Sequence, residues 1–261
     1  MKTSALASLL CAFAVLPFAS SLNAADAYST TFATPPYTLG TTVIGTDGWV
    51  LPSAGSSSAS TLATVIAAPW DSNARVLSLA GSATNNRLKN SSFTAFTTGE
   101  VEANASLAFD ATTSHSGRYT QVAFQDLTST SSPLTFGLNY TSTGGLYYQA
   151  RGDVEVVILA KSDVKLNALY VFSLDIDLDA STFDILVTGI KADDSPFTYS
   201  QSGITWTGSK SFSTLFLNNT SAYTSYVDAI SIHPVPEPSS VALLAIGAVL
   251  VGVSQARKQR K

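Results

Sequence analysis

The clearest pattern in the chain is an alternation of apolar and polar residues that begins at position 170. Positions 170, 172, 174, 176 and 178 carry large apolar side chains, and three of the positions between and after them carry Asp. A period of two residues is typical of a β-strand with one buried and one solvated face. A short turn at 180–182 and a second alternation at 183–187 follow. Together these segments predict a β-hairpin.

Short β-rich runs of the same kind recur through residues 28–233, and none of this region has the period of an amphipathic helix. Turn-forming residues such as Gly-Ser, Thr-Gly and Asn-Asn separate the runs. Many short strands at this spacing predict an all-β protein with one domain, a two-sheet sandwich over residues 28–233. The further runs lie at 61–67, 75–80, 101–109, 119–126, 134–140, 154–160, 214–217 and 226–232.

The N-terminal segment differs in composition from this body. Lys2 precedes an apolar run at 5–18 and then small residues, which predicts a helical secretory signal peptide over residues 1–27 and passage through the Sec translocon. Cleavage is expected after Ala24, Ala25 or Ala27. The only cysteine, Cys11, lies inside this segment. The exported protein therefore has no thiol, which excludes disulfides, cysteine nucleophiles and cysteine-ligated metals.

The C-terminal segment is a candidate membrane span. Residues 239–254 are almost entirely apolar, and as a helix they extend roughly 20–24 Å, slightly less than the roughly 30 Å hydrocarbon core of a bilayer. A basic cluster follows at 257–261, formed by Arg257, Lys258, Arg260 and Lys261. These residues favour a cytoplasmic C-terminus, so the body is expected on the far side of the inner membrane.

The distribution of charge narrows the functions open to the body. Only 12% of the residues are charged, the net charge is -4, and four of the 14 Lys and Arg residues lie in the last five positions. The body therefore has no basic face of the kind that nucleic-acid binding requires, because that binding depends on neutralising phosphates.

The C-terminal region also carries a resemblance to a known sorting signal. Pro236, Glu237 and Pro238 stand ahead of the apolar segment and the basic end. In this order, on a chain with a signal peptide, the tail at 235–261 resembles the PEP-CTERM signal of Gram-negative bacteria that make extracellular polysaccharide. The resemblance implies that an exosortase, a membrane cysteine protease, recognises this tripeptide, removes the tail and delivers the body to the cell surface or extracellular matrix. The two prolines also keep the segment extended.

A second resemblance concerns the body. The segment Gly-Thr-Asp-Gly-Trp at 45–49, the hairpin at 170–189 and the closing run at 226–232 are similar in order and spacing to concanavalin A-like jelly rolls of the laminin G and lectin/glucanase type. The resemblance implies an antiparallel jelly roll whose last strand pairs near the first. This fold is shared by lectins, hydrolases and structural modules, so it does not define a function.

Three carboxylates are candidates for chemistry. Asp175, Asp177 and Asp179 are predicted on one face of one strand, with neighbours roughly 6.6 Å apart. They are interpreted first as a solvated face that discourages edge pairing. Two alternatives stay open: a calcium site, because hard cations prefer clustered carboxylates, and glycoside hydrolysis, which uses two carboxylates roughly 5–9.5 Å apart. The glucanases that the body resembles carry two Glu flanking an Asp, whereas this chain has three Asp.

Asp228, in the closing run, is a further candidate. By alternation it is expected on the same side as Tyr226, Ile230 and Ile232, and therefore partly buried. A buried carboxylate needs a hydrogen-bond partner or a cation. The residue is interpreted as a backbone-bonded structural group, with a calcium ligand as the alternative.

Aromatic side chains are the candidates for sugar binding, which commonly depends on a ring stacked on a pyranose. Those near expected loops are Trp70, Trp206, Tyr147 and Tyr148, with core packing as the alternative. Trp49 is expected in the core. His115 and His233 are isolated in the sequence and are not expected to form a catalytic triad or a zinc site.

These observations predict an exported, non-catalytic structural or interaction protein at the cell surface or in the extracellular matrix, rather than an enzyme. No feature requires a cofactor, and calcium stays an open possibility. The alternative is a carbohydrate-binding module for extracellular polysaccharide, and a glycoside hydrolase is third.

Overall fold

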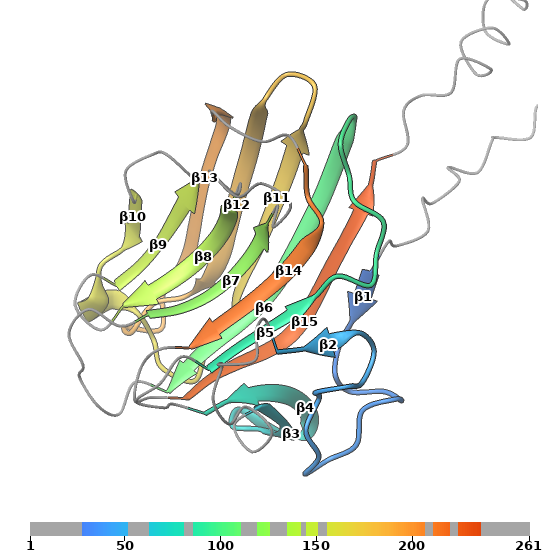
Figure 1. The fold of residues 1–261 in the computed structure, drawn as a ribbon. Helices are drawn as coiled ribbons and strands as arrows, with labels where there is room; N and C mark the ends of the chain where they lie inside the picture. The colour runs from blue at the N-terminus through green and yellow to red at the C-terminus, as the bar shows by residue number, and fades with distance from the viewer. Residues whose placement is uncertain are drawn as a thin grey trace, which may run out of the picture. The chain divides into compact units, whose positions relative to one another are not determined.

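The computed structural model describes residues 28–51, 63–80, 86–110, 119–125, 135–141, 145–150, 156–206, 211–219 and 224–235. In these residues the chain forms two antiparallel β-sheets that pack face to face (Figure 1). They belong to one compact unit, Asp26–Val235. The predicted all-β antiparallel jelly-roll sandwich is confirmed. The helices expected at 1–27 and 239–254 lie outside the described residues.

In the described part, sheet A has eight strands in the order β13-β12-β11-β6-β15-β4-β3, and β1 also pairs with β15. Their bounds are β1 (Tyr28–Thr30), β3 (Ala63–Ala68), β4 (Asp71–Leu79), β6 (Glu100–Asp110), β11 (Tyr170–Asp177), β12 (Thr182–Ile190), β13 (Pro196–Thr205) and β15 (Thr224–Pro234).

Sheet B has seven strands over the same described residues, in the order β10-β9-β8-β7-β14-β5-β2. A single turn of 3₁₀ helix, η1 (Lys161–Asp163), follows β10. The bounds of the strands are β2 (Trp49–Val50), β5 (Asn86–Asn90), β7 (Tyr119–Gln125), β8 (Thr135–Thr141), β9 (Gly145–Ala150), β10 (Val156–Leu159) and β14 (Thr214–Asn219).

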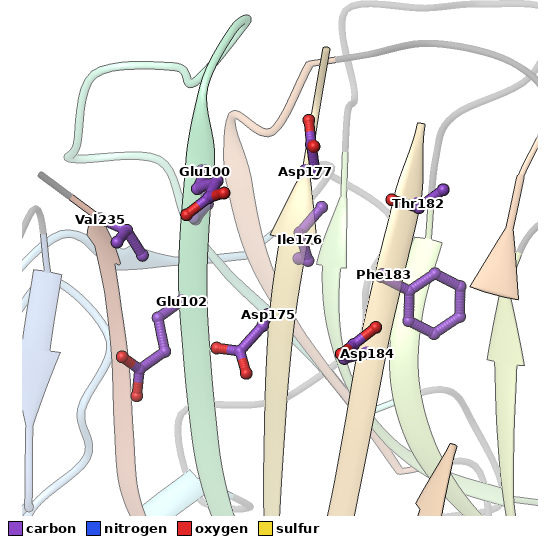
Figure 2. Close-up of a pocket in the computed structure, with 10 residues that line it drawn as sticks. Glu100, Glu102, Asp175, Ile176, Asp177, Thr182, Phe183, Asp184 and Val235 are labelled. Carbon is purple, nitrogen blue, oxygen red and sulfur yellow. The ribbon is translucent and has the colours of Figure 1, made fainter. Parts of the chain in front are cut away.

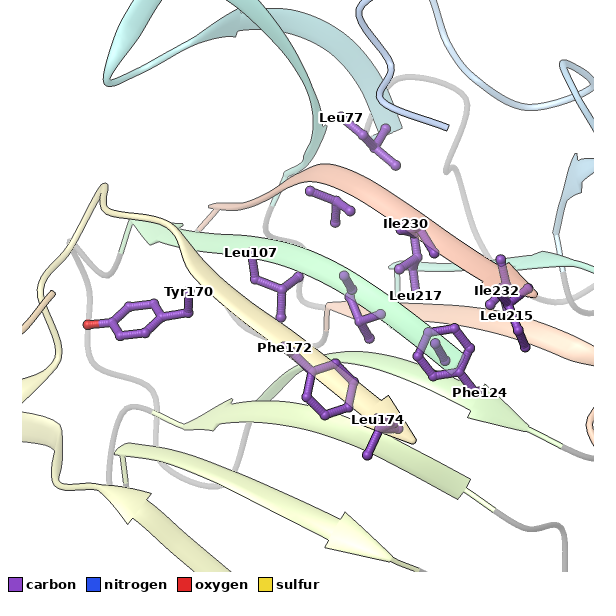
Figure 3. Packing of buried hydrophobic residues seen from close by; sticks show 14 of the residues in the cluster. Leu77, Leu107, Phe124, Tyr170, Phe172, Leu174, Leu215, Leu217, Ile230 and Ile232 are labelled. Atoms are coloured by element: carbon purple, nitrogen blue, oxygen red, sulfur yellow. The ribbon is translucent and has the colours of Figure 1, made fainter. Parts of the chain in front are cut away.

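The core lies between the two sheets (Figure 3). Phe172 of sheet A and Phe124 of sheet B are stacked, with ring centroids 6.4 Å apart and an interplanar angle of 22°. Leu107 and Ile230 from sheet A, and Leu217 from sheet B, are fully buried in the same layer. The apolar half of the alternation at 170–178 fills this layer, which explains its regularity: every second side chain of β11 points toward sheet B.

The expected strands agree closely with the structure. Each β-rich run overlaps a strand, with ends that differ by one or two residues in several cases, and the hairpin is formed by β11 and β12, whose last pair is Asp177 with Thr182. The strands that the pattern does not predict are β1, β2, β5, β9 and β13. β1 and β2 have only three and two residues. β13 escapes the pattern because most of its side chains are exposed or half-buried and polar, so no alternation identifies it.

The closing of the jelly roll follows the expected topology. The last strand, β15, pairs with the first, β1, in the register Tyr28 with Ile232 and Thr30 with Ile230. The expectation that the last strand pairs near the first is confirmed.

Candidate functional site

Four polar side chains lie in one row across sheet A. The register pairs His233 of β15 with Glu102 of β6, and Glu102 in turn with Asp175 of β11. Asp175 also pairs with Asp184 of β12. The adjacent residue Leu174 is buried in the core, so the row lies on the face of sheet A that points away from sheet B.

Three of these side chains, Glu102, Asp175 and Asp184, border a groove of about 430 Å³ on that outer face (Figure 2). We call it the acidic groove. Val235, which directly precedes the tripeptide at 236–238, also lines it, and its N–H donates a hydrogen bond to the carbonyl of Glu100 at 2.9 Å. The carboxylates that line the groove are Glu100, Glu102, Asp175, Asp177 and Asp184.

Hydrogen bonds position several of these carboxylates. Nε2 of His233 lies 3.1 Å from Oε2 of Glu102, and the side-chain amide of Asn104 donates to Oε1 of the same residue at 2.9 Å. Oδ1 of Asp184 accepts the N–H of Gly203 at 2.8 Å. The rim of the groove is therefore held by contacts with the surrounding strands.

Asp175 lies in the middle of this row of negative charge. Partial burial raises the pKa of its carboxyl above the ordinary value. The charges of Glu102, Asp184 and Glu100 raise this pKa further, and His233 acts in the opposite direction. Like charges that face each other across strands destabilise a sheet, so the row has an electrostatic cost when all its members are ionised.

Replacing Asp175 by Asn is expected to stabilise the protein at neutral pH. Because the folded-state pKa is raised, the folded state binds more protons than the unfolded state just above pH 3.8, so stability falls as pH rises through that window. The variant lacks this loss. Its free energy of unfolding at pH 7 should exceed that of the wild type by about 0.5 kcal/mol, a value reduced for solvent screening. Below pH 3.8 the two should converge, as urea unfolding at several pH values would show.

Asp193→Asn provides a control of opposite sign. Hydrogen bonds from Ser195 lower the pKa of the Asp193 carboxyl, so its contribution to stability is present above the ordinary pKa and is lost as pH falls. This variant should be less stable than the wild type at pH 7. If Asp175→Asn were also destabilising at pH 7, repulsion between Asp175 and the neighbouring carboxylates would not explain the effect of this residue on stability.

The three aspartates of the predicted cluster have different positions. Asp175 and Asp177 share the outer face of β11, as expected. Asp179 lies beyond the end of β11, and its carboxylate accepts the N–H of Gly99 at 3.2 Å. In the described residues, no three His, Cys, Asp or Glu side chains are grouped so that they could hold a metal ion. The expected single row of three is wrong, because the strand ends at Asp177. The calcium interpretation stays a prediction.

Asp228 is also placed differently from the expectation. A β-bulge between Val227 and Ala229 shifts the register of β15, and Asp228 is the extra residue. Val227 and Ile230 face the core, whereas Tyr226 packs on the outer face of sheet A. The expected grouping of Tyr226 with Ile230 and Ile232 on one side is therefore wrong, because a bulge interrupts the period of two, whereas the expected partial burial of Asp228 is confirmed. Asp228 is half-buried, and this burial raises the pKa of its carboxyl.

Three of the four candidate sugar-stacking residues are buried. Trp206 is 5% exposed, Tyr147 4% and Tyr148 5%. The hydroxyl of Tyr148 donates to Oε1 of Gln201 at 3.0 Å, and the ring of Trp206 packs against Phe183. A ring enclosed to this extent presents no face to a sugar, so the core-packing alternative describes these three, as it does Trp49. Tyr148 lies under the opposite sheet, where its ring meets Phe183 edge to face with ring centroids 6.3 Å apart.

Trp70 is different. It lies in the turn between β3 and β4, is half-buried, and meets Tyr226 edge to face with ring centroids 5.9 Å apart. Both rings belong to a small apolar cluster on the outer face of sheet A. Of the four candidates, Trp70 alone keeps a partly exposed ring.

Sequence reasoning missed most of the acidic groove. Glu100, Glu102 and Asp184 were not singled out, and His233 was expected to be isolated. The available signal was the spacing of two residues between Glu100 and Glu102, which places both on one face of a strand. That spacing does not reveal which strands are neighbours.

The residues of the sorting tail lie outside the described residues: Pro236, Glu237, Pro238, Arg257, Lys258, Arg260 and Lys261. His115 and the expected cleavage sites do as well. Within the described part, no helix has the length and apolar character needed to cross a membrane.

Comparison with known proteins supports the two resemblances. Residues 234–259 match the family described as the PEP-CTERM protein-sorting motif, which confirms that prediction and implies export and processing by an exosortase. No curated protein matches the chain.

Solved structures with a similar fold include enzymes and lectins that act on or bind carbohydrate. A carbohydrate esterase from Shiga toxin-encoding bacteriophage phi24B is 11% identical, with 81% of this chain and 99% of that chain covered and a TM-score of 0.49. Peanut lectin is 7% identical (78% and 95% covered, TM-score 0.46). A β-glucanase catalytic domain from Podospora anserina is 15% identical (72% and 85% covered, TM-score 0.45). At these identities the likeness concerns the fold alone.

Proposed function

We propose that this protein is exported, loses its C-terminal tail to an exosortase, and acts at the cell surface or in the extracellular matrix as a non-catalytic structural or interaction module. The match of residues 234–259 to the PEP-CTERM motif is the observation that carries the proposal. The fold agrees with it: β15 stays paired with β6 through Pro234, and the compact unit that holds the sandwich is Asp26–Val235. Removal of the residues after the tripeptide at 236–238 is therefore expected to leave the sandwich intact.

Glu237→Ala is expected to block processing of the full chain. In a host with an exosortase, the wild-type protein should lose its tail and appear outside the inner membrane, whereas the variant should accumulate uncut in the membrane fraction. The measurement is the size and location of the protein on immunoblots after fractionation. Ser239→Ala, just after the Pro-Glu-Pro tripeptide, is the control and should be processed normally.

Two results would contradict this. Normal processing of Glu237→Ala would show that the tripeptide is not what the host recognises. Unchanged processing of the wild-type chain after deletion of the exosortase would show that another protease removes the tail.

The non-catalytic part of the proposal is supported by the chemistry of the acidic groove. Its lining residues in the described part include no Ser, Cys or His that could serve in a nucleophilic triad, and this chain has three Asp where the glucanases that the body resembles carry two Glu flanking an Asp. The exported chain has no thiol. A polysaccharide-cleaving activity that Asp177→Asn abolishes without unfolding the protein would overturn this part.

A carbohydrate-binding role is the second candidate, and the partly exposed ring of Trp70 beside Tyr226 is the observation that favours it. The test is binding of the exported protein to a panel of extracellular polysaccharides, with and without calcium. If the ring stacks on a sugar, Trp70→Ala should weaken binding about five- to tenfold. Val171→Ala, an exposed residue on the same outer face, is the matched control. Absence of binding to the whole panel would remove this candidate.

A further inference from the structure

The chain between the core and the sorting tripeptide is very short. The last core residue of β15 is Ile232, which is fully buried. It is held on both sides, since it pairs with Ala103 of β6 and with Tyr28 of β1. Only residues 233–235 separate Ile232 from the tripeptide at 236–238. We call residues 233–235 the stem.

The stem is paired with β6 along its whole length. His233 lies opposite Glu102, and Pro234 lies opposite Val101. Val235 N–H donates a hydrogen bond to the carbonyl of Glu100 at 2.9 Å. Pairing with the sheet therefore extends to the residue directly before the tripeptide, and no spacer lies between the two.

The stem is held less firmly than the rest of β15. Among the described strands, β6 alone pairs with it, because the pairing of β1 ends at Ile232. The stem residues are half-buried, whereas Ile230 and Ile232 are buried. Pro234 has no N–H to donate. Chain ends with few buried apolar contacts open at a lower free energy than core strands, so the stem is the first part of β15 to separate.

The main side-chain contact of the stem lies on the outer face of sheet A. Nε2 of His233 is 3.1 Å from Oε2 of Glu102, and the two side chains are 24% and 38% exposed. Water therefore reaches this contact, which makes it weaker than a buried one. It adds to the backbone pairing of the stem without making the separation of the stem from β6 prohibitively costly.

We propose that the stem detaches from β6 when the exosortase engages residues 236–238, and that His233, through its contact with Glu102, sets how readily it detaches. The inference rests on the proposed function. Proteases cut chain that has opened from the folded structure, and here the residue adjoining the tripeptide is bonded to the sheet. Ile232 stops the separation because it is buried and paired on both sides. His233 is thus a positioning residue for processing.

A disulfide across the stem of the full chain tests this proposal. His233→Cys with Glu102→Cys would be made in a Cys11→Ala background and expressed in a host with an exosortase. Paired strands bring facing Cα atoms to roughly 4.5–5.5 Å, within disulfide reach. Alkylation with a thiol-reactive mass tag identifies the chains in which the disulfide has closed. In a pulse–chase experiment, these chains should lose the tail about fivefold or more slowly than the control, and dithiothreitol should restore the rate.

Ser106→Cys with Ala229→Cys is the matched control. These residues also pair between β6 and β15, but before Ile232, in a part of the strand that is expected to stay in place. A disulfide there should leave tail removal unchanged.

His233→Ala gives the opposite perturbation without any disulfide. Loss of a partly exposed contact should speed tail removal about two- to fivefold relative to Ser231→Ala, a substitution in β15 before Ile232.

Three results would overturn the proposal: tail removal from the locked stem at the rate of the control, failure of the stem pair to close while the control pair closes, or slower processing of His233→Ala than of Ser231→Ala. Failure of the proposed function gives a different result. The wild-type chain would then keep its tail, or would lose it equally in a host without the exosortase.

Discussion

Replacing Phe172 by Ala is expected to lower the free energy of unfolding by about 3–5 kcal/mol, the range for a fully buried Phe. Phe172 is completely buried in β11 and stacks on Phe124 across the core (Figure 3). Strands pair on both sides of β11, so the backbone cannot move inward to fill the cavity. The measurement is urea unfolding of the purified protein, followed by tryptophan fluorescence.

Val171→Ala is the control for this prediction. Val171 is the next residue on the same strand but faces solvent, so its truncation should cost less than about 0.5 kcal/mol. Equal effects of the two substitutions would show that the side chains of β11 do not alternate between core and solvent as described.

Replacing Gly145 by Ala is expected to destabilise the protein by on the order of 4 kcal/mol and to loosen the β9–β10 edge. Gly145 has a φ of +96°, which side chains rarely adopt, and a Cβ there would lie 2.3 Å from the carbonyl oxygen of Leu159 and 2.5 Å from the nitrogen of Lys161. Both are backbone atoms, so no rotamer change relieves the contact. Thermal unfolding and hydrogen exchange of β9 amides would measure the two effects.

Gly203→Ala separates the effect of the positive φ from the effect of the close contact with backbone atoms. Gly203 also has a positive φ, +67°, but nothing lies within 4 Å of the added Cβ. Only backbone strain remains there, so the cost should be about 1–2 kcal/mol. If both substitutions cost the same, the close approach of β9 to the chain after β10 would not be the main cause of the destabilisation at Gly145.

Strands were predictable where one face is buried and the other is wet. The alternation at 170–178 identified β11 and its hairpin with β12, and β-rich runs located β3, β4 and most of sheet B. β13 was missed because its side chains are mainly polar and exposed, so no alternation marks it as the partner of β12. β9 was missed because Tyr147 and Tyr148 were expected near a loop, although both lie inside the strand Gly145–Ala150.

The candidate site was less predictable. Asp175 and Asp177 were found on one face of a strand, but their neighbours Glu102 and Asp184 come from other strands of the sheet. Nothing in a local period shows which strands are adjacent. The bulge at Asp228 could not be predicted either, because one extra residue on one strand does not change the composition of that strand in a recognisable way.

The sequence alone determined the sorting tail and the all-β class, because each depends on residues that are close together in the chain. The tertiary structure decided which carboxylates share a groove and which aromatic rings are enclosed. Strand order and register set these features. Both are long-range properties, because residues from different strands become neighbours only when the strands of the whole domain have paired.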